Sequence, residues 1–147
     1  MAMLTKGLWV IVADSEKAMI LSNEGDTRRP DLREIDHLTA PAVVMNSDRP
    51  GRVHESMGTR QSALEVPDFE RLNAEKMVVD LLALLGKKAA AGAFTHMVIA
   101  APPQVLGAIR DRMPDALRGR VLAELDKTLT KHSMAGIAEI VAAALEG

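Results

Sequence analysis

The chain has 147 residues, of which 48% are hydrophobic and 26% are charged, and its formal net charge is -2. A chain of this size can bury about 70% of its unfolded surface, which favours one folded domain over residues 1–147 and argues against disorder. The near balance of charge gives no general attraction to nucleic acid or to an anionic membrane, and the absence of cysteine excludes disulfides and thiolate-bound metals.

The N-terminal residues lack the pattern of an export signal or a membrane anchor. One lysine is followed by the apolar run LWVIVA, residues 8–13, which ends at Asp14. This run is shorter than a signal-peptide core and far shorter than a membrane span. The sequence therefore predicts a cytoplasmic protein with no membrane partner.

Three strands are predicted in the N-terminal part of the chain. The continuous apolar run of residues 8–13 is typical of a strand buried on both faces, and residues 17–23 follow after a short polar turn, so the two predict a hairpin. The mixed polar and apolar residues 32–39 suit a third strand near the edge of the sheet.

Residues 46–62, NSDRPGRVHESMGTRQS, show neither strand nor helix periodicity. Long segments without secondary structure are uncommon inside compact domains and are often functional. The sequence therefore predicts a functional loop at residues 46–62.

A helix is predicted over residues 68–85, capped by Asp68 and stopped by Gly86. Its apolar residues fall close to a helical period: Phe69, Leu72, Met77, Val78, Leu81, Leu82 and Leu85. Residues 96–101 are apolar apart from His96 and predict a buried parallel strand.

A second helix is predicted to start at Pro103 and to end at Pro114, because the missing N–H of a proline costs nothing in a first helical turn. Its inner stripe comprises Val105, Leu106, Ile109 and Met113.

Two more elements are predicted after this helix. In residues 120–130, apolar and polar side chains alternate, as in a strand with one face more exposed to solvent than the other. Ser133 is expected to cap a terminal helix. That helix has the inner stripe Met134, Ile137, Ile140, Val141 and Leu145.

This order of elements predicts one α/β domain with three layers. Hairpin strands pair antiparallel, and right-handed crossovers place the fourth strand beside the first. The expected result is a mixed five-stranded sheet of order 3-2-1-4-5 with three helices, which is the arrangement of ribonuclease H-like folds.

The sequence resembles the bacterial host attachment protein family, named for proteins required for attachment to host cells. The segments that carry the resemblance run in the family's order from residue 9 to residue 130: WVIVADSEKAMIL, SDRPGR, SALE, FTHMVIAAPPQVLGAIR and ELDKTLT. The resemblance implies a ribonuclease H-like domain with a link to cell attachment.

That family is in turn similar to the middle domain of eukaryotic and archaeal class-1 translation release factors. In those factors, a loop between the third strand and the first helix carries Gly-Gly-Gln, whose glutamine reaches the peptidyl-transferase centre. The loop at the same topological place here contains Gly58, Thr59, Arg60 and Gln61, without the glycine pair. The resemblance makes Gln61 the candidate catalytic residue.

Several other chemistries are not indicated. A ribonuclease H-like nuclease needs several converging carboxylates, whereas the strand at 96–101 ends without an acid, and Asp14 and Glu124 have no evident partners. The histidines His37, His54, His96 and His132 are far apart in sequence, so no metal site is predicted. No nucleotide-binding glycine motif is present, so no cofactor is predicted.

Two groups of arginines could contact an anionic partner. Arg110, Arg112, Arg118 and Arg120 are interleaved with acids and favour a solvated, partly self-neutralised face over an RNA contact. In the loop, Pro50 and Gly51 favour a tight turn that either is braced by Asp48 or presents arginines to a phosphate or carboxylate. The predicted partner-binding residues are Asp48, Arg49, Gly51, Arg52, His54, Arg60 and Gln61.

Three functional hypotheses remain. The leading one is a cytoplasmic, non-enzymatic binding module that affects attachment to host cells indirectly, with RNA or the ribosome as partner. The second is a release-factor-like hydrolase that cleaves peptidyl-tRNA through residues 46–62. The third is a module that binds a small molecule or a protein and has no nucleic-acid role. A homo-oligomer is compatible with each.

Overall fold

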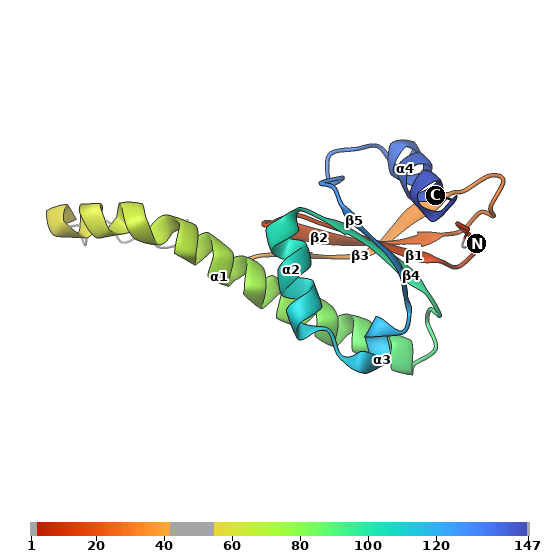
Figure 1. Ribbon diagram of the computed structural model, residues 1–147, viewed down its shortest axis with the longest axis horizontal. Helices are drawn as coiled ribbons and strands as arrows, with labels where there is room; N and C mark the ends of the chain where they lie inside the picture. Colours follow the sequence, from red (N-terminus) through yellow and green to blue (C-terminus); the bar gives the residue numbers. More distant parts are fainter. Residues whose placement is uncertain (1–2, 42–54, 147) are drawn as a thin grey trace.

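The computed structural model describes residues 3–41 and 55–146, and for residues 55–70 it describes the backbone alone. This part of the chain forms five strands and four helices (Figure 1). They are β1 (Trp9–Ala13), β2 (Lys17–Asn23), β3 (Leu32–Thr39), α1 (Glu55–Ala90), β4 (Met97–Ala101), α2 (Pro103–Arg112), α3 (Asp115–Arg118), β5 (Val121–Asp126) and α4 (Met134–Glu146).

The strands form one mixed sheet in the order β3-β2-β1-β4-β5, which confirms the predicted order. β1 pairs antiparallel with β2, as the hairpin prediction requires, and parallel with β4. β4 also pairs parallel with β5. All residues of β1 and β4 are buried because both strands lie in the middle of the sheet with helices on each face, which explains their unbroken apolar sequences.

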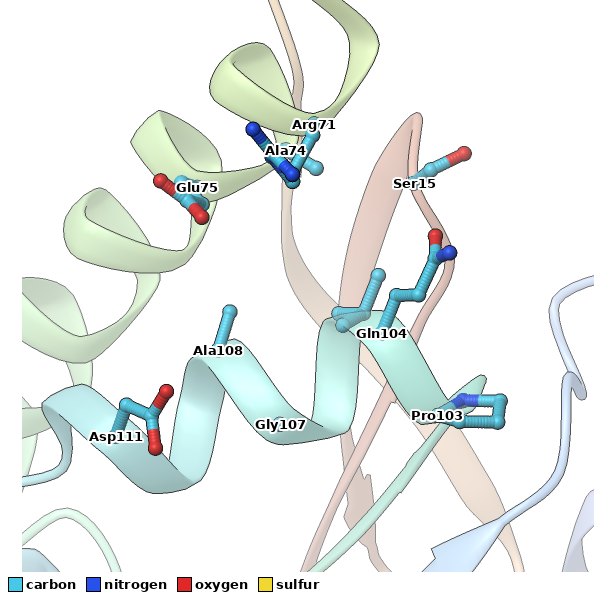
Figure 2. A pocket seen from close by; sticks show the side chains of 10 residues that line it. Ser15, Arg71, Ala74, Glu75, Pro103, Gln104, Gly107, Ala108 and Asp111 are labelled. Atoms are coloured by element: carbon cyan, nitrogen blue, oxygen red, sulfur yellow. The ribbon is translucent and has the colours of Figure 1, made fainter. Parts of the chain in front are cut away.

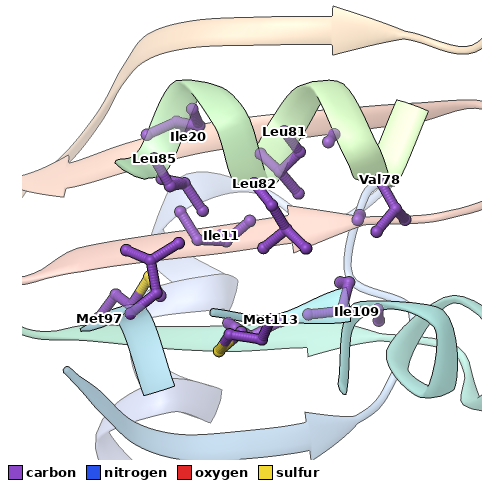
Figure 3. Packing of buried hydrophobic residues seen from close by; sticks show 14 of the residues in the cluster. Ile11, Ile20, Val78, Leu81, Leu82, Leu85, Met97, Ile109 and Met113 are labelled. Atoms are coloured by element: carbon purple, nitrogen blue, oxygen red, sulfur yellow. The ribbon is translucent and has the colours of Figure 1, made fainter. Parts of the chain in front are cut away.

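The helices form layers on the two faces of the sheet. Buried residues of α1, α2 and α3 pack with Ile11, Ile20 and Met97 on one face (Figure 3). On the opposite face, α4 covers Val10 and Val98 (Figure 1). Successive residues of the central strands thus contribute to opposite cores, and the predicted three-layer architecture is confirmed.

The first helix is longer than the sequence predicted. α1 has 36 residues and includes Asp68, so the predicted cap at that residue is wrong, and residues 55–62 are helical rather than part of a loop. The helix also continues through Gly86. It ends at Ala90, and Gly92 adopts the left-handed conformation (φ 80°) that commonly follows a helix.

Smaller differences concern the ends and the faces of elements. A short helix, α3, follows Pro114 and was not predicted, and β5 ends at Asp126, before the predicted end of that strand. Leu72 and Met134 were expected in inner stripes but are 48% and 36% exposed.

In the described parts of the chain, none of the helices combines the length and the apolar character needed to cross a membrane.

Candidate functional site

The predicted site residues lie between β3 and α1 and in the first turns of α1. Asp48, Arg49, Gly51, Arg52 and His54 lie outside the described residues. Arg60 and Gln61 belong to α1, with the preceding Gly58 and Thr59. The expectation that these four residues lie in a loop is therefore corrected.

The N-terminal part of α1 extends beyond the sheet (Figure 1). Core contacts of this helix begin at Ala74 among the residues whose side chains are described and continue to Leu85. The backbone of Arg60 and Gln61 is therefore carried away from the folded body by the helix itself. This placement suits a segment that contacts another molecule.

A second candidate site, which the sequence analysis missed, is a cleft of about 640 Å³ between α1 and α2 (Figure 2). Ser15, two residues after β1, and Pro103 and Gln104, the first residues of α2 after β4, line one end. The sheet order reverses between these two strands, because β1 leads to β2 on one side and β4 leads to β5 on the other. In open α/β sheets, ligands bind outside the carboxyl ends of the strands at such a reversal.

Polar side chains line this cleft along its length. Figure 2 shows Ser15 and Gln104 at one end, Glu75 and Asp111 at the other, and Arg71 on α1 between them. The middle of the cleft is formed by small residues: Ala74, Gly107 and Ala108.

The arginines around the end of α2 have partners inside the protein. Arg110 pairs with Glu124, and Arg112 Nη2 donates to Glu75 Oε1 at 3.4 Å. Arg118 donates to the carbonyl oxygen of Met113 at 3.0 Å. Arg118 also lies 3.8 Å from Asp115. Acids therefore neutralise this face, although Glu124 and Glu75 come from outside the interleaved segment, and Glu124 is satisfied by its ion pair.

Arg120 belongs to a stack of side chains. It donates to the carbonyl oxygens of Phe94 and Thr95, each at 3.3 Å, and its guanidinium carbon lies 5.8 Å from the centre of the Phe94 ring. Phe94 also stacks on Trp9, with ring centres 4.4 Å apart. Because Trp9 and Phe94 are buried and stacked on each other, neither ring can stack on a base.

Asp14, at the turn between β1 and β2, is held by three hydrogen bonds. One carboxylate oxygen accepts from the amides of Glu16 (2.7 Å) and Lys17 (2.8 Å), and the other accepts from the Thr130 hydroxyl at 2.7 Å. Partial burial alone raises the pKa of Asp14, but these hydrogen bonds and the charge of Lys17 together outweigh burial and lower that pKa. Asp14 is therefore a structural carboxylate, and no group of three metal-ligating side chains forms among the described residues.

The sequence matches the family described as bacterial archaeo-eukaryotic release factor family 12 over residues 7–141. The chain belongs to this family. The match supports the release-factor part of the expected resemblance, whereas the family's description says nothing of attachment to host cells.

Two solved structures are similar to this family 12 protein. The archaeal translation termination factor aRF1 has 14% identity and a TM-score of 0.44, and the alignment covers 95% of this chain and 39% of that one. Saccharomyces cerevisiae Dom34, a translation termination-like factor involved in RNA quality control pathways and interacting with Hbs1, has 11% identity and a TM-score of 0.45. That alignment covers 97% of this chain and 36% of Dom34. No curated protein sequence matches.

The α1–α2 cleft of the family 12 protein could have been found in the sequence. The prediction of a 3-2-1-4-5 sheet already implied a reversal between the first and fourth strands. Ser15 and Pro103 mark the carboxyl ends of those strands. The contribution of Arg71 and Glu75 could not have been found, because it depends on the angle at which α1 crosses α2.

Proposed function

We propose that this family 12 protein acts on the ribosome as a release-factor-like protein and presents residues 46–62 to a peptidyl-tRNA. The observation that carries the proposal is the family match over residues 7–141. The position of the segment supports it: residues 46–62 span the connection from β3 to α1 and the first turns of α1. The release factors that the sequence resembles carry their Gly-Gly-Gln loop at the same topological place.

The reaction would be hydrolysis of the ester between peptide and tRNA. Water adds to the ester carbonyl, the bond to the tRNA ribose oxygen breaks, and one proton passes to that leaving oxygen, so that free peptide and tRNA result. Gln61 is the candidate for positioning the water, because an amide side chain both donates and accepts hydrogen bonds and stays uncharged.

Recognition of tRNA or ribosomal RNA would fall to the arginines of the same segment. Arg110, Arg112 and Arg118 have partners inside the protein, which disfavours them as phosphate contacts. Arg49, Arg52 and Arg60 would provide planar donors to phosphate oxygens beside Gln61.

The test is release of peptide from ribosomes that carry peptidyl-tRNA and lack a stop signal. We expect the wild-type protein to release peptide and Gln61→Ala to lower the rate by roughly 100-fold, the size of a lost general acid–base or water-positioning contact. Alanine is a good helix former, so this substitution within α1 should not impair folding. Lys76→Ala, an exposed change on the same helix, is the matched control and should keep the wild-type rate.

Binding is measured separately by co-sedimentation with ribosomes over a series of salt concentrations. Phosphate contacts predict binding that weakens steeply as salt rises, and Gln61→Ala should bind as wild type does. Binding without peptide release would favour the hypothesis of a non-enzymatic ribosome-binding module over that of a hydrolase. The absence of binding at low salt would contradict the proposal and favour a module without a nucleic-acid role.

An effect on attachment to host cells rests on the sequence resemblance alone and stays a prediction. Under this proposal the effect would be indirect, through translation. Cells that produce only the Gln61→Ala protein should then attach like cells that lack the protein. Normal attachment by those cells would separate attachment from peptide release.

A further inference from the structure

The α1–α2 cleft has the properties of a small-molecule site, and none of its lining residues belongs to the segment 46–62. Its volume of about 640 Å³ falls within the range of roughly 300–1,000 Å³ that is usual for ligand pockets. It also lies where β1 and β4 end and the sheet order reverses, which is the position that ligands occupy in open α/β sheets. Size and position thus independently indicate a binding site.

The distribution of polar groups indicates what kind of ligand fits. Glu75 and Asp111 place two carboxylates at one end of the cleft (Figure 2). Gln104 and Ser15 at the other end offer hydrogen-bond donors, Arg71 lies on α1 between the two ends, and the N-terminus of α2 has no side-chain cap. A ligand with a cationic end and a carboxylate end would match both, because each charge would face groups of opposite polarity.

The length of the cleft limits the separation of those two charges. Gln104 and Asp111, at the two ends, are seven residues apart on α2, so the ends are roughly 10 Å apart at 1.5 Å per helical residue. An extended basic amino acid, or two to three residues of extended peptide at about 3.3 Å each, spans this distance.

Gly107 keeps the middle of the cleft open. It lies inside α2, where glycine lowers helix stability relative to alanine. Its backbone does not require glycine, since its φ is not positive, and an added Cβ would meet no atom within 4 Å. A larger side chain at this position would therefore occupy open space at the cleft that Gly107 lines.

We propose that the α1–α2 cleft binds a ligand that carries a guanidinium or ammonium group at one end and a carboxylate at the other, as a basic amino acid or the C-terminal basic residue of a peptide does. The cation lies against Asp111 and Glu75, and the carboxylate lies between Arg71 and Gln104. The pair of Glu75 with Arg112 does not prevent this, because it is exposed and a ligand can share that carboxylate. The site is independent of the proposed peptide release.

The test is titration of the isotope-labelled protein with L-arginine, followed by NMR of backbone amides. We expect shifts at Ser15, Ala74, Gln104 and Asp111. Citrulline, whose side chain is neutral, and agmatine, which lacks the carboxylate, should each bind at least roughly tenfold more weakly than arginine, because each loses one charge-assisted contact. Glycyl-arginine separates the two sources: tighter binding than arginine identifies a peptide C-terminus, and equal or weaker binding identifies the free amino acid.

Gly107→Leu should fill the cleft and abolish these shifts while the rest of the spectrum stays native. Gly86→Leu is the matched control, since Gly86 is also a helix-interior glycine with open space around its Cβ position, and it should bind arginine as wild type does. Equal binding of citrulline, unchanged binding by Gly107→Leu, or no amide shift with arginine would each overturn the proposal.

Discussion

At the scale of single residues, Asn23 shows how a buried polar side chain fixes a chain terminus. Its side chain is fully buried at the end of β2. Its Nδ2 donates to the carbonyl oxygens of Leu4 and Thr5, each at 3.0 Å, and its Oδ1 accepts from the amides of Gly25 at 3.1 Å and Asp31 at 2.8 Å. One amide group thereby joins the N-terminal segment to the turn between β2 and β3.

The turn itself requires glycine at position 25. An added Cβ would lie 2.1 Å from the carbonyl oxygen of Arg29, which is far inside van der Waals contact with backbone. Asn23 and Gly25 therefore depend on each other, because the amide of Gly25 reaches Asn23 only while this close approach is possible.

Asn23→Ala should lower the free energy of unfolding by about 3–5 kcal/mol, since it removes four hydrogen bonds and leaves buried polar groups without partners. Urea unfolding at fixed pH measures the change. Asn73→Ala, on the partly exposed side of α1, is the control and should change stability by less than about 0.5 kcal/mol. A loss of less than about 1 kcal/mol for Asn23→Ala would mean that water replaces the side chain at little cost.

At the scale of elements, each helix is recognisable from sequence only where it packs or where a side chain caps it. The apolar period of α1 lies where the helix covers the sheet, at Met77, Leu81 and Leu85. Its first turns extend beyond the sheet and need no apolar stripe, and Pro67 suggests a boundary there. The sequence therefore predicts the packed part of α1 and misses the projecting part.

The cap of α4 was predicted correctly. Ser133 Oγ accepts a hydrogen bond from the amide of Gly136 at 3.0 Å, which satisfies one of the free N–H groups of the first turn. This cap acts through neighbouring residues and could be predicted from the sequence, unlike the cap predicted at Asp68, which lies inside α1.

Ser133→Ala should destabilise the protein by about 1 kcal/mol through loss of this cap. Hydrogen exchange of the first amides of α4 is the specific measurement, and these amides should exchange faster while those of β1 and β4 change less. Ser133→Asp should restore protection because its carboxylate can accept the same hydrogen bond. Equal exchange in the alanine variant and the wild type would show that solvent replaces the cap.

At the scale of the whole molecule, Asp14 and Thr130 connect segments that are far apart in the chain. Thr130 is buried in the connection between β5 and α4, and its hydroxyl donates to a carboxylate at the opposite end of the sequence. This contact joins the β1–β2 turn to the layer that α4 forms. It also makes the stability of the whole fold depend on the ionisation of one group.

The pKa of Asp14 in the folded protein lies below its ordinary value of about 3.9. The stabilisation that ionised Asp14 gives to the folded protein is therefore complete above that ordinary value, and it is lost as pH falls through the lower folded pKa. In Asp14→Asn, the free energy of unfolding should fall less steeply than in the wild type as pH drops below about 4, as measured by urea unfolding at a series of pH values. Thr130→Val, which replaces the hydroxyl with a methyl group, should have a smaller effect in the same direction.

An isosteric threonine-to-valine change separates the hydrogen bond from packing. If both variants lose stability in acid as the wild type does, other carboxylates cause that loss. The hydrogen bond between Asp14 and Thr130 would then make no measurable contribution to it.

The sequence by itself determined the sheet order, the burial of β1 and β4 and the N-cap of α4. Each depends on local spacing, on apolar periodicity or on the right-handedness of crossovers. Tertiary structure alone decided the exposure of Leu72, the helical state of Arg60 and Gln61, and the contribution of Arg71 and Glu75 to the α1–α2 cleft. These depend on where α1 stops covering the sheet and how it crosses α2, and such geometry is set by packing between residues distant in sequence.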